Sequence, residues 1–93
     1  MFIGLCTIEL LIDEADSLKD KRRLLKSLME RVKSLYNVSV AEIDQQDVWR
    51  RSTLAFTCVA NEKKHVFRVL QSAVAFFEKQ RRSQVIDYRI EII

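Results

Sequence analysis

Proline is absent from this chain of 93 residues, and Gly4 is its only glycine. Flexible linkers and disordered segments are usually rich in both residues, and a phosphate-binding loop needs several glycines to bring its backbone close to the ligand. The composition therefore argues against disorder, linkers and glycine-rich phosphate loops. A chain of this length can bury one hydrophobic core, so we expect a single domain that spans residues 1–93.

Cysteine and histidine are also scarce, with only Cys6, Cys58 and His65 present. No Cys-x-x-Cys pair, signal peptide or apolar run long enough to cross a bilayer is found, which predicts a reducing, cytoplasmic location with buried thiols and no membrane partner. Two thiols and one imidazole are too few ligands for a structural zinc site. We expect no catalytic residue, no metal and no cofactor, and thus not an enzyme.

Positive charge is concentrated in one part of the chain. The formal net charge is only +3, but residues 19–33 hold seven basic and two acidic side chains. A mildly basic protein with one concentrated patch suits a polyanionic partner.

Hydrophobic periodicity predicts four strands and two helices. Alternating patterns predict the strands, in chain order, at residues 2–12, 38–44, 52–60 and 85–93. Repeats of 3.6 residues predict one helix that follows an N-cap at Ser17 and a second that follows an N-cap at Asn61. We expect Asn37 to end the first helix, and residues 45–51 to form a turn or one short helical turn.

This order predicts an α+β ferredoxin-like sandwich, β-α-β-β-α-β, with a four-stranded antiparallel sheet and two helices on one face. We expect the first and third strands to lie side by side at the centre and to run parallel to each other. RNA-binding modules and acylphosphatases share this fold, so the fold does not assign a function. The acidic loop at residues 13–16 would repel a phosphate, and the parity of Phe56 places it in the core rather than on an open face that could stack bases.

The first helix carries a basic ridge, defined as the exposed cations on its flank. Lys21 is an exception because it projects into the apolar face on a helical wheel. The ridge can contact phosphates, or it can be an ordinary solvated helix face. The candidate binding residues on this helix are Lys19, Lys21, Arg22, Arg23 and Lys26.

The segment after the second strand holds the only tryptophan. Trp49 can stack on a base with Arg50 beside it, or it can pack as a plug at the sheet edge. The acids Glu42, Asp44 and Asp47 could attract a hard cation, but we favour the interpretation that they protect an edge strand from aggregation. The candidate binding residues in this segment are Gln46, Asp47, Trp49 and Arg50.

Two stretches resemble the YlxP-like family of small bacterial proteins along essentially the whole chain. They read Ser-Leu-Lys-x-Lys-Arg from Ser17, followed by Leu-Lys-Ser-Leu from Leu25, and Asn-Val-Ser-Val-Ala-Glu-Ile-Asp-x-Gln-Asp-x-Trp from Asn37. The resemblance implies a ferredoxin-like fold and a cytoplasmic bacterial protein without an assigned activity or known catalytic residues. Members commonly lie beside genes for translation initiation factor two and a ribosome-binding factor, which implies a link to translation or ribosome maturation. Since Lys21 falls within the first stretch, we expect it to contact a partner.

Two hypotheses of different classes follow. The leading one is a non-enzymatic protein that binds ribosomal RNA or a ribosome-bound factor through the basic ridge and the Trp49 segment. The alternative is a homo-oligomeric module, such as a homodimer, that binds a protein or a small ligand on the open sheet face around Leu5.

Overall fold

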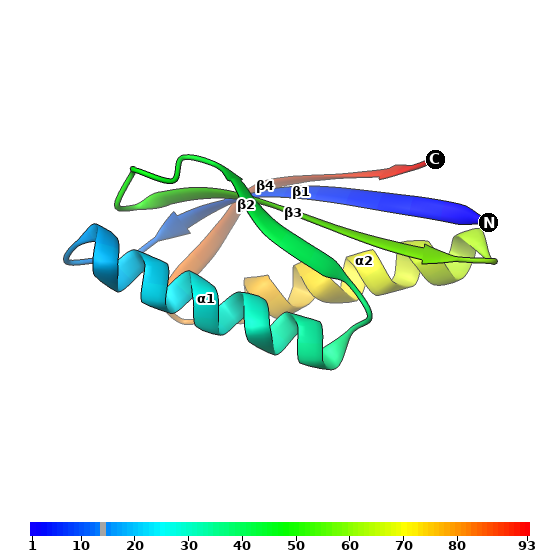
Figure 1. Ribbon diagram of the computed structural model, residues 1–93, viewed down its shortest axis with the longest axis horizontal. Helices are drawn as coiled ribbons and strands as arrows, with labels where there is room; N and C mark the ends of the chain where they lie inside the picture. The colour runs from blue at the N-terminus through cyan, green and yellow to red at the C-terminus, as the bar shows by residue number, and fades with distance from the viewer. Residues whose placement is uncertain (14) are drawn as a thin grey trace.

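The computed structural model describes residues 1–13 and 15–93. Its elements follow the order that the sequence predicts: β1 (Phe2–Ile12), α1 (Leu18–Leu35), β2 (Ser39–Asp44), β3 (Arg51–Ala60), α2 (Lys63–Glu78) and β4 (Ser83–Ile92). Figure 1 shows the sheet as one layer with both helices on the same side of it. The predicted ferredoxin-like sandwich is confirmed.

The sheet has the strand order β2-β3-β1-β4, and each neighbouring pair is antiparallel. The prediction that the two central strands run parallel is wrong. The crossover through α1 makes β1 and β2 parallel but leaves one strand position between them, and the short β2–β3 connection turns the chain back into that position. β3 therefore runs antiparallel to both neighbours, with Phe2 opposite Ala60 and Leu10 opposite Ser52.

α1 begins at a side-chain cap, as predicted. The Ser17 hydroxyl accepts a hydrogen bond from the backbone N–H of Asp20 at 3.1 Å, and the Asp20 carboxylate accepts one from the N–H of Asp16 at 3.3 Å. The first bond satisfies an N–H group that the first helical turn leaves without a partner, and the second ties the residue before the N-cap to the helix. The helix ends at Tyr36, which is extended, and Asn37 does not adopt a positive φ angle.

α2 packs directly on the centre of the sheet because Gly4 of β1 has no side chain. A Cβ atom on Gly4 would overlap Val66 Cγ1 and lie 2.7 Å from Leu70 Cδ1. Further along the helix, the Phe77 ring stacks on Phe56 of β3 with 6.0 Å between the ring centroids. Phe56 thus lies in the core, as its parity predicted.

The core fills the space between the helices and one face of the sheet. Side chains on the other face, among them Leu5, Thr7 and Val59, are not covered by a helix (Figure 1). α2 begins one residue after the predicted position, with Glu62 at the N-cap and no capping bond from its side chain. No helix in the described part of the chain is both long and apolar enough to cross a membrane.

Candidate functional site

The β2–β3 connection is a fixed turn rather than a helical turn. Gln45 adopts φ 63°, and its N–H donates to the Asp44 carboxylate at 2.8 Å. Its carbonyl accepts from the N–H of Val48 at 3.1 Å, and its side-chain amide donates to the Thr53 hydroxyl at 2.8 Å. A left-handed residue other than glycine costs free energy, and these three bonds offset that cost. The turn therefore presents residues 46–50 in a defined position.

Lys21 links this turn to α1. Its side chain is fully buried, and its ammonium group lies 3.1 Å from the Glu42 carboxylate and donates to the Gln45 carbonyl at 2.6 Å. The same carboxylate accepts from the hydroxyl of the buried Ser52 at 2.6 Å. A buried ammonium group is stable only when it is paired and hydrogen-bonded in this way.

The prediction that Lys21 contacts a partner is therefore wrong. From its helical spacing, this side chain was expected to project toward the core, but the sequence did not show which acidic residue would lie beside it. Glu42 is that residue because the parity of β2 turns it toward the helices, opposite Leu54. We name Lys21, Glu42, Ser52 and the Gln45 carbonyl the buried ion-pair cluster.

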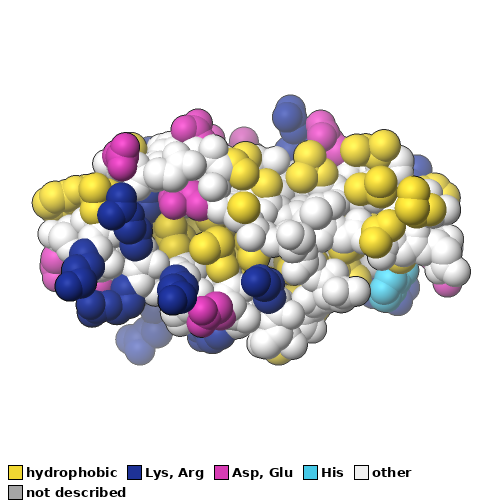
Figure 2. Space-filling view, in the orientation of Figure 1, with side chains coloured by type: hydrophobic (Ala, Val, Ile, Leu, Met, Phe, Trp, Pro, Cys, Tyr) yellow, Lys and Arg dark blue, Asp and Glu magenta, His cyan; other side chains and the backbone are white. Residues whose placement is uncertain are grey.

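The remaining residues of the basic ridge are exposed, namely Lys19, Arg22, Arg23 and Lys26. Figure 2 shows Lys and Arg side chains gathered over the first half of α1. One of them, Arg22, reaches the β2–β3 turn, where its guanidinium lies 3.7 Å from the Asp47 carboxylate. Both side chains are more than half exposed, so the pair adds less than about 1 kcal/mol to stability. The pair nonetheless makes the ridge and the turn one continuous surface.

Trp49 is not a core residue. Half of its side chain is exposed (50%), and its neighbours Val48, Arg50 and Arg51 are exposed too. This exposure excludes a core position for Trp49, whereas a plug at an interface and a ring that stacks on a base both use an indole that is partly open to solvent.

A second charged feature lies at the end of β1. The N–H of Ile12 donates to the carbonyl of Arg50, and the N–H of Asp13 donates to the carbonyl of Arg82, both at 2.8 Å. These bonds bring the segments before β3 and β4 to either side of the β1 terminus. Their side chains line a hollow of about 670 Å³, which we name the arginine hollow: Asp13, Arg50, Arg81 and Arg82.

Arg81 and Arg82 were missed from the sequence, where they fell in a polar run after the second helix. The predicted parallel direction of the first and third strands concealed the signal, because only antiparallel neighbours place the segments before β3 and β4 beside the end of β1. The Arg82 guanidinium donates to the Asp20 carboxylate at 2.7 Å. This bond, with that from the Asp16 N–H, holds the pKa of Asp20 below its usual value.

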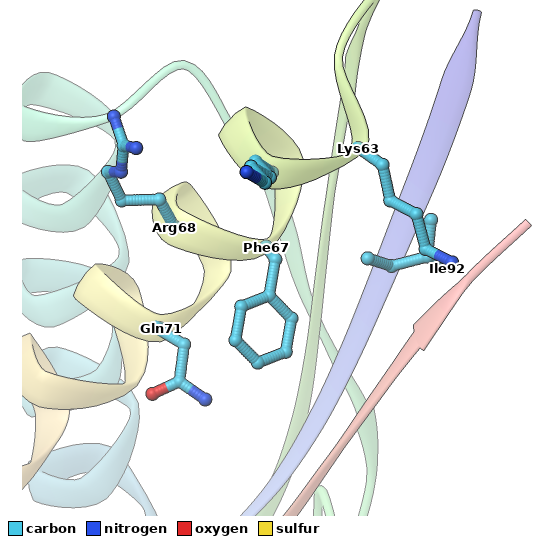
Figure 3. Close-up of a pocket in the computed structure, with 6 residues that line it drawn as sticks. Lys63, Phe67, Arg68, Gln71 and Ile92 are labelled. Atoms are coloured by element: carbon cyan, nitrogen blue, oxygen red, sulfur yellow. The ribbon is translucent and has the colours of Figure 1, made fainter.

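A third feature is an apolar hollow of about 760 Å³ between α2 and the end of β4 (Figure 3). Phe67 projects from α2 into this space and is 46% exposed, with Ile92 of β4 opposite. Lys63, Lys64 and Arg68 stand around it. The hollow can hold an apolar group beside a negative charge, but nothing in the sequence pointed to it.

Among the residues that the structure describes, the thiols and the imidazole do not form a nucleophile–base pair. Cys6 and Cys58 are both buried, and burial raises the pKa of Cys6 to about 12 and also raises that of Cys58. A protonated, buried thiol is a poor nucleophile. His65 lies exposed on α2. The described residues contain no group of three or more His, Cys, Asp or Glu side chains that could hold a metal ion.

Comparison with solved structures places the chain in the ferredoxin-like class. It matches the de novo designed protein Foldit4 with a TM-score of 0.54 and 16% identity, covering 100% of this chain and 97% of that one. It also matches a de novo designed protein with a ferredoxin fold, with a TM-score of 0.56 and 12% identity, covering 100% of this chain and 84% of that one. At such low identity the similarity concerns the fold alone.

The sequence comparisons identify the family. Residues 3–90 match the family described as "Protein of unknown function (DUF503)". The chain is 37% identical over 76 residues to "Uncharacterized protein YlxP" of Bacillus subtilis (strain 168), covering 82% of this chain and 83% of that protein. The chain belongs to this family, as the two stretches quoted from the sequence predicted.

Proposed function

We propose that this protein is a non-enzymatic, cytoplasmic RNA-binding protein that contacts ribosomal RNA during translation or ribosome maturation. The observation that carries the proposal is the continuous exposed surface formed by the basic ridge and the turn at residues 46–50. The link to translation rests on the YlxP-like resemblance and its gene neighbourhood.

The two parts of this surface have different tasks. The four exposed cations of the ridge are spaced along one side of a helix, so they can follow a phosphate backbone without reading its sequence. Trp49 supplies a stacking face, which contributes about 1–3 kcal/mol per base in single-stranded complexes. Gln46 and Asp47 add side chains that can hydrogen-bond to base edges. The buried ion-pair cluster keeps helix and turn in register, although Lys21 itself makes no RNA contact.

The test is co-sedimentation with ribosomal subunits across a salt series, with the variant Lys19→Gln/Arg22→Gln/Arg23→Gln/Lys26→Gln beside the wild type. Affinity falls as salt rises, and the loss of four phosphate contacts should make this fall shallower, reducing the magnitude of the slope of log affinity against log salt concentration by about three. The matched control removes three exposed cations from α2 and one at its C-cap by Lys63→Gln/Lys64→Gln/Arg68→Gln/Lys79→Gln, and it should leave binding nearly unchanged.

Equal losses in both variants would show only non-specific attraction to RNA, and absence of binding at low salt would refute the proposal. Binding to subunits that survives in the ridge variant, combined with no binding to purified ribosomal RNA, would point to a ribosome-bound factor instead.

The open sheet face supports a second candidate, a homodimer. Ile3, Leu5 and Val59 lie on this face, and Val59 is 57% exposed. Burying such a face against a second copy would remove apolar area from water. The Leu5→Glu variant should then become monomeric in sedimentation, whereas a wild-type protein that is already monomeric at high concentration would exclude this candidate.

A further inference from the structure

The arginine hollow has a composition unlike the rest of the surface. The four described residues that line it are all charged, and three of them are arginines from two segments that lie far apart in the sequence. The main-chain bonds from Ile12 and Asp13 fix both segments against β1, so the three arginines meet at a rigid part of the fold. Asp20 compensates the charge of Arg82, whereas no ion pair among the described residues compensates Arg50 or Arg81, and an anionic ligand would offset their repulsion.

The guanidinium of Arg82 is held in place at the wall of the hollow. It lies 2.7 Å from the carboxylate of Asp20 on α1, so α1 and the segments before β3 and β4 all meet at the hollow. A guanidinium that is already oriented loses less entropy when it binds a ligand than a mobile lysine does. Arg50 and Arg81 are exposed and can move toward a ligand.

The size and charge of the hollow favour a phosphate monoester over a phosphodiester. A volume of about 670 Å³ is in the range of small-ligand sites and accepts more than a bare phosphate ion. Arg82 is already paired with Asp20, so the excess of positive charge comes from Arg50 and Arg81, set against the carboxylate of Asp13 among the described lining residues. Arginine binds phosphate through paired hydrogen bonds, and the terminal phosphate of a monoester offers three free oxygens and nearly two negative charges.

We infer that the arginine hollow binds a phosphate monoester, of the kind found at the 5′ end of an RNA strand. The assignment of this phosphate to an RNA strand rests on the proposed function. The hollow lies at the same end of the molecule as the start of α1, which carries the basic ridge. Trp49 directly precedes Arg50 in the chain and is the only tryptophan, so its fluorescence provides a local probe of occupancy.

The experiment compares two ten-nucleotide RNAs of one sequence, one with a 5′-phosphate and one with a 5′-hydroxyl, both labelled at the 3′ end. The wild type should bind the phosphorylated strand about tenfold more tightly, as expected for charge-assisted hydrogen bonds. Arg81→Gln should abolish this preference while changing affinity for the hydroxyl strand by less than about twofold. The control Lys79→Gln, which removes an equal charge nearby, should retain it, and Asp13→Asn should increase it.

Equal affinity of the wild type for both strands would overturn the inference and leave the proposed function standing. If neither strand binds, the proposed function fails, and the hollow is then tested with adenosine 5′-monophosphate. A change in Trp49 fluorescence that saturates with this nucleotide and is lost in Arg81→Gln would support the inference, and no change would refute it.

Discussion

α1 and α2 cover the same face of the sheet but are attached to it by different interactions. The five buried residues of α2 are all apolar, and Gly4 lets this helix lie directly on β1. α1 has an apolar stripe as well, but its buried residues include the charged Lys21. α2 is positioned mainly by shape and apolar burial, whereas α1 depends in part on an ion pair with Glu42.

This difference separates a helix that is held mainly by packing from one that also carries part of the surface proposed to bind RNA. An ion pair has directional partners, so it fixes the rotation of α1 about its own axis and the position of the β2–β3 turn at the same time. The basic ridge and Trp49 are then presented together. Apolar packing under α2 needs no such register, since hydrophobic burial is non-directional.

The largest expected effect comes from breaking the ion pair. Lys21→Ala leaves the Glu42 carboxylate and the Gln45 carbonyl without their charged partner, and losing one member of a buried pair typically costs about 3–5 kcal/mol. Urea denaturation should show this loss in the free energy of unfolding, and the turn should become susceptible to proteolysis. Lys26→Ala, on the exposed ridge of the same helix, should change stability by less than about 0.5 kcal/mol.

The double variant Lys21→Met/Glu42→Leu sharpens this test. Replacing a whole buried pair by apolar residues is often neutral, so much of the lost stability should return. RNA binding should not return with it, because the turn has lost its link to α1. Similar destabilisation in Lys21→Ala and Lys26→Ala would mean that the ion pair does not position the helix.

A smaller effect should follow from forcing α2 away from the sheet. Gly4→Val inserts atoms where Val66 and Leu70 already lie, and overpacking of this kind costs about 1–3 kcal/mol. Ala41→Val introduces the same side chain at an exposed position of β2 and serves as the control, which should stay within about 0.5 kcal/mol of the wild type. Unchanged stability of Gly4→Val would show that α2 can shift freely. Binding at the ridge, on the other helix, should persist.

The smallest effect concerns Asp20 at the start of α1. Its native pKa lies below the ordinary value of 3.8, chiefly because of the hydrogen bond from Arg82. The ionised carboxylate therefore stabilises the fold above that value, and this contribution disappears as the pH falls through the lower native pKa. Thermal midpoints of the wild type and Asp20→Asn should differ by a constant amount above about pH 4 and converge below it. Asp47→Asn is the matched control, and a difference that persists into acid would contradict the assignment.

The sequence was informative about the fold because its patterns are local. Two-residue alternation and 3.6-residue repeats predicted the six elements in their correct order, and the hydroxyl of Ser17 marked the start of α1. The relative direction of the two central strands was predicted wrongly. It depends on which position in the sheet the third strand occupies, and no local sequence pattern encodes that position.

Functional residues were harder to predict because their roles depend on partners distant in sequence. Lys21 was expected to contact a partner because it projects into the apolar face and lies within the first family stretch, but Glu42, 21 positions later, pairs with it inside the fold. Conversely, Arg81 and Arg82 looked like an ordinary polar connection, and only the bonds at the end of β1 bring them beside Arg50.

The sequence by itself determined the family, the order of the elements and the charge of α1, because each is encoded in residues close together along the chain. The tertiary structure alone decided which charges are neutralised in the interior and which gather around the arginine hollow. Electrostatic interactions depend on distance in space and on exposure to water, and both are set only when the sheet is assembled.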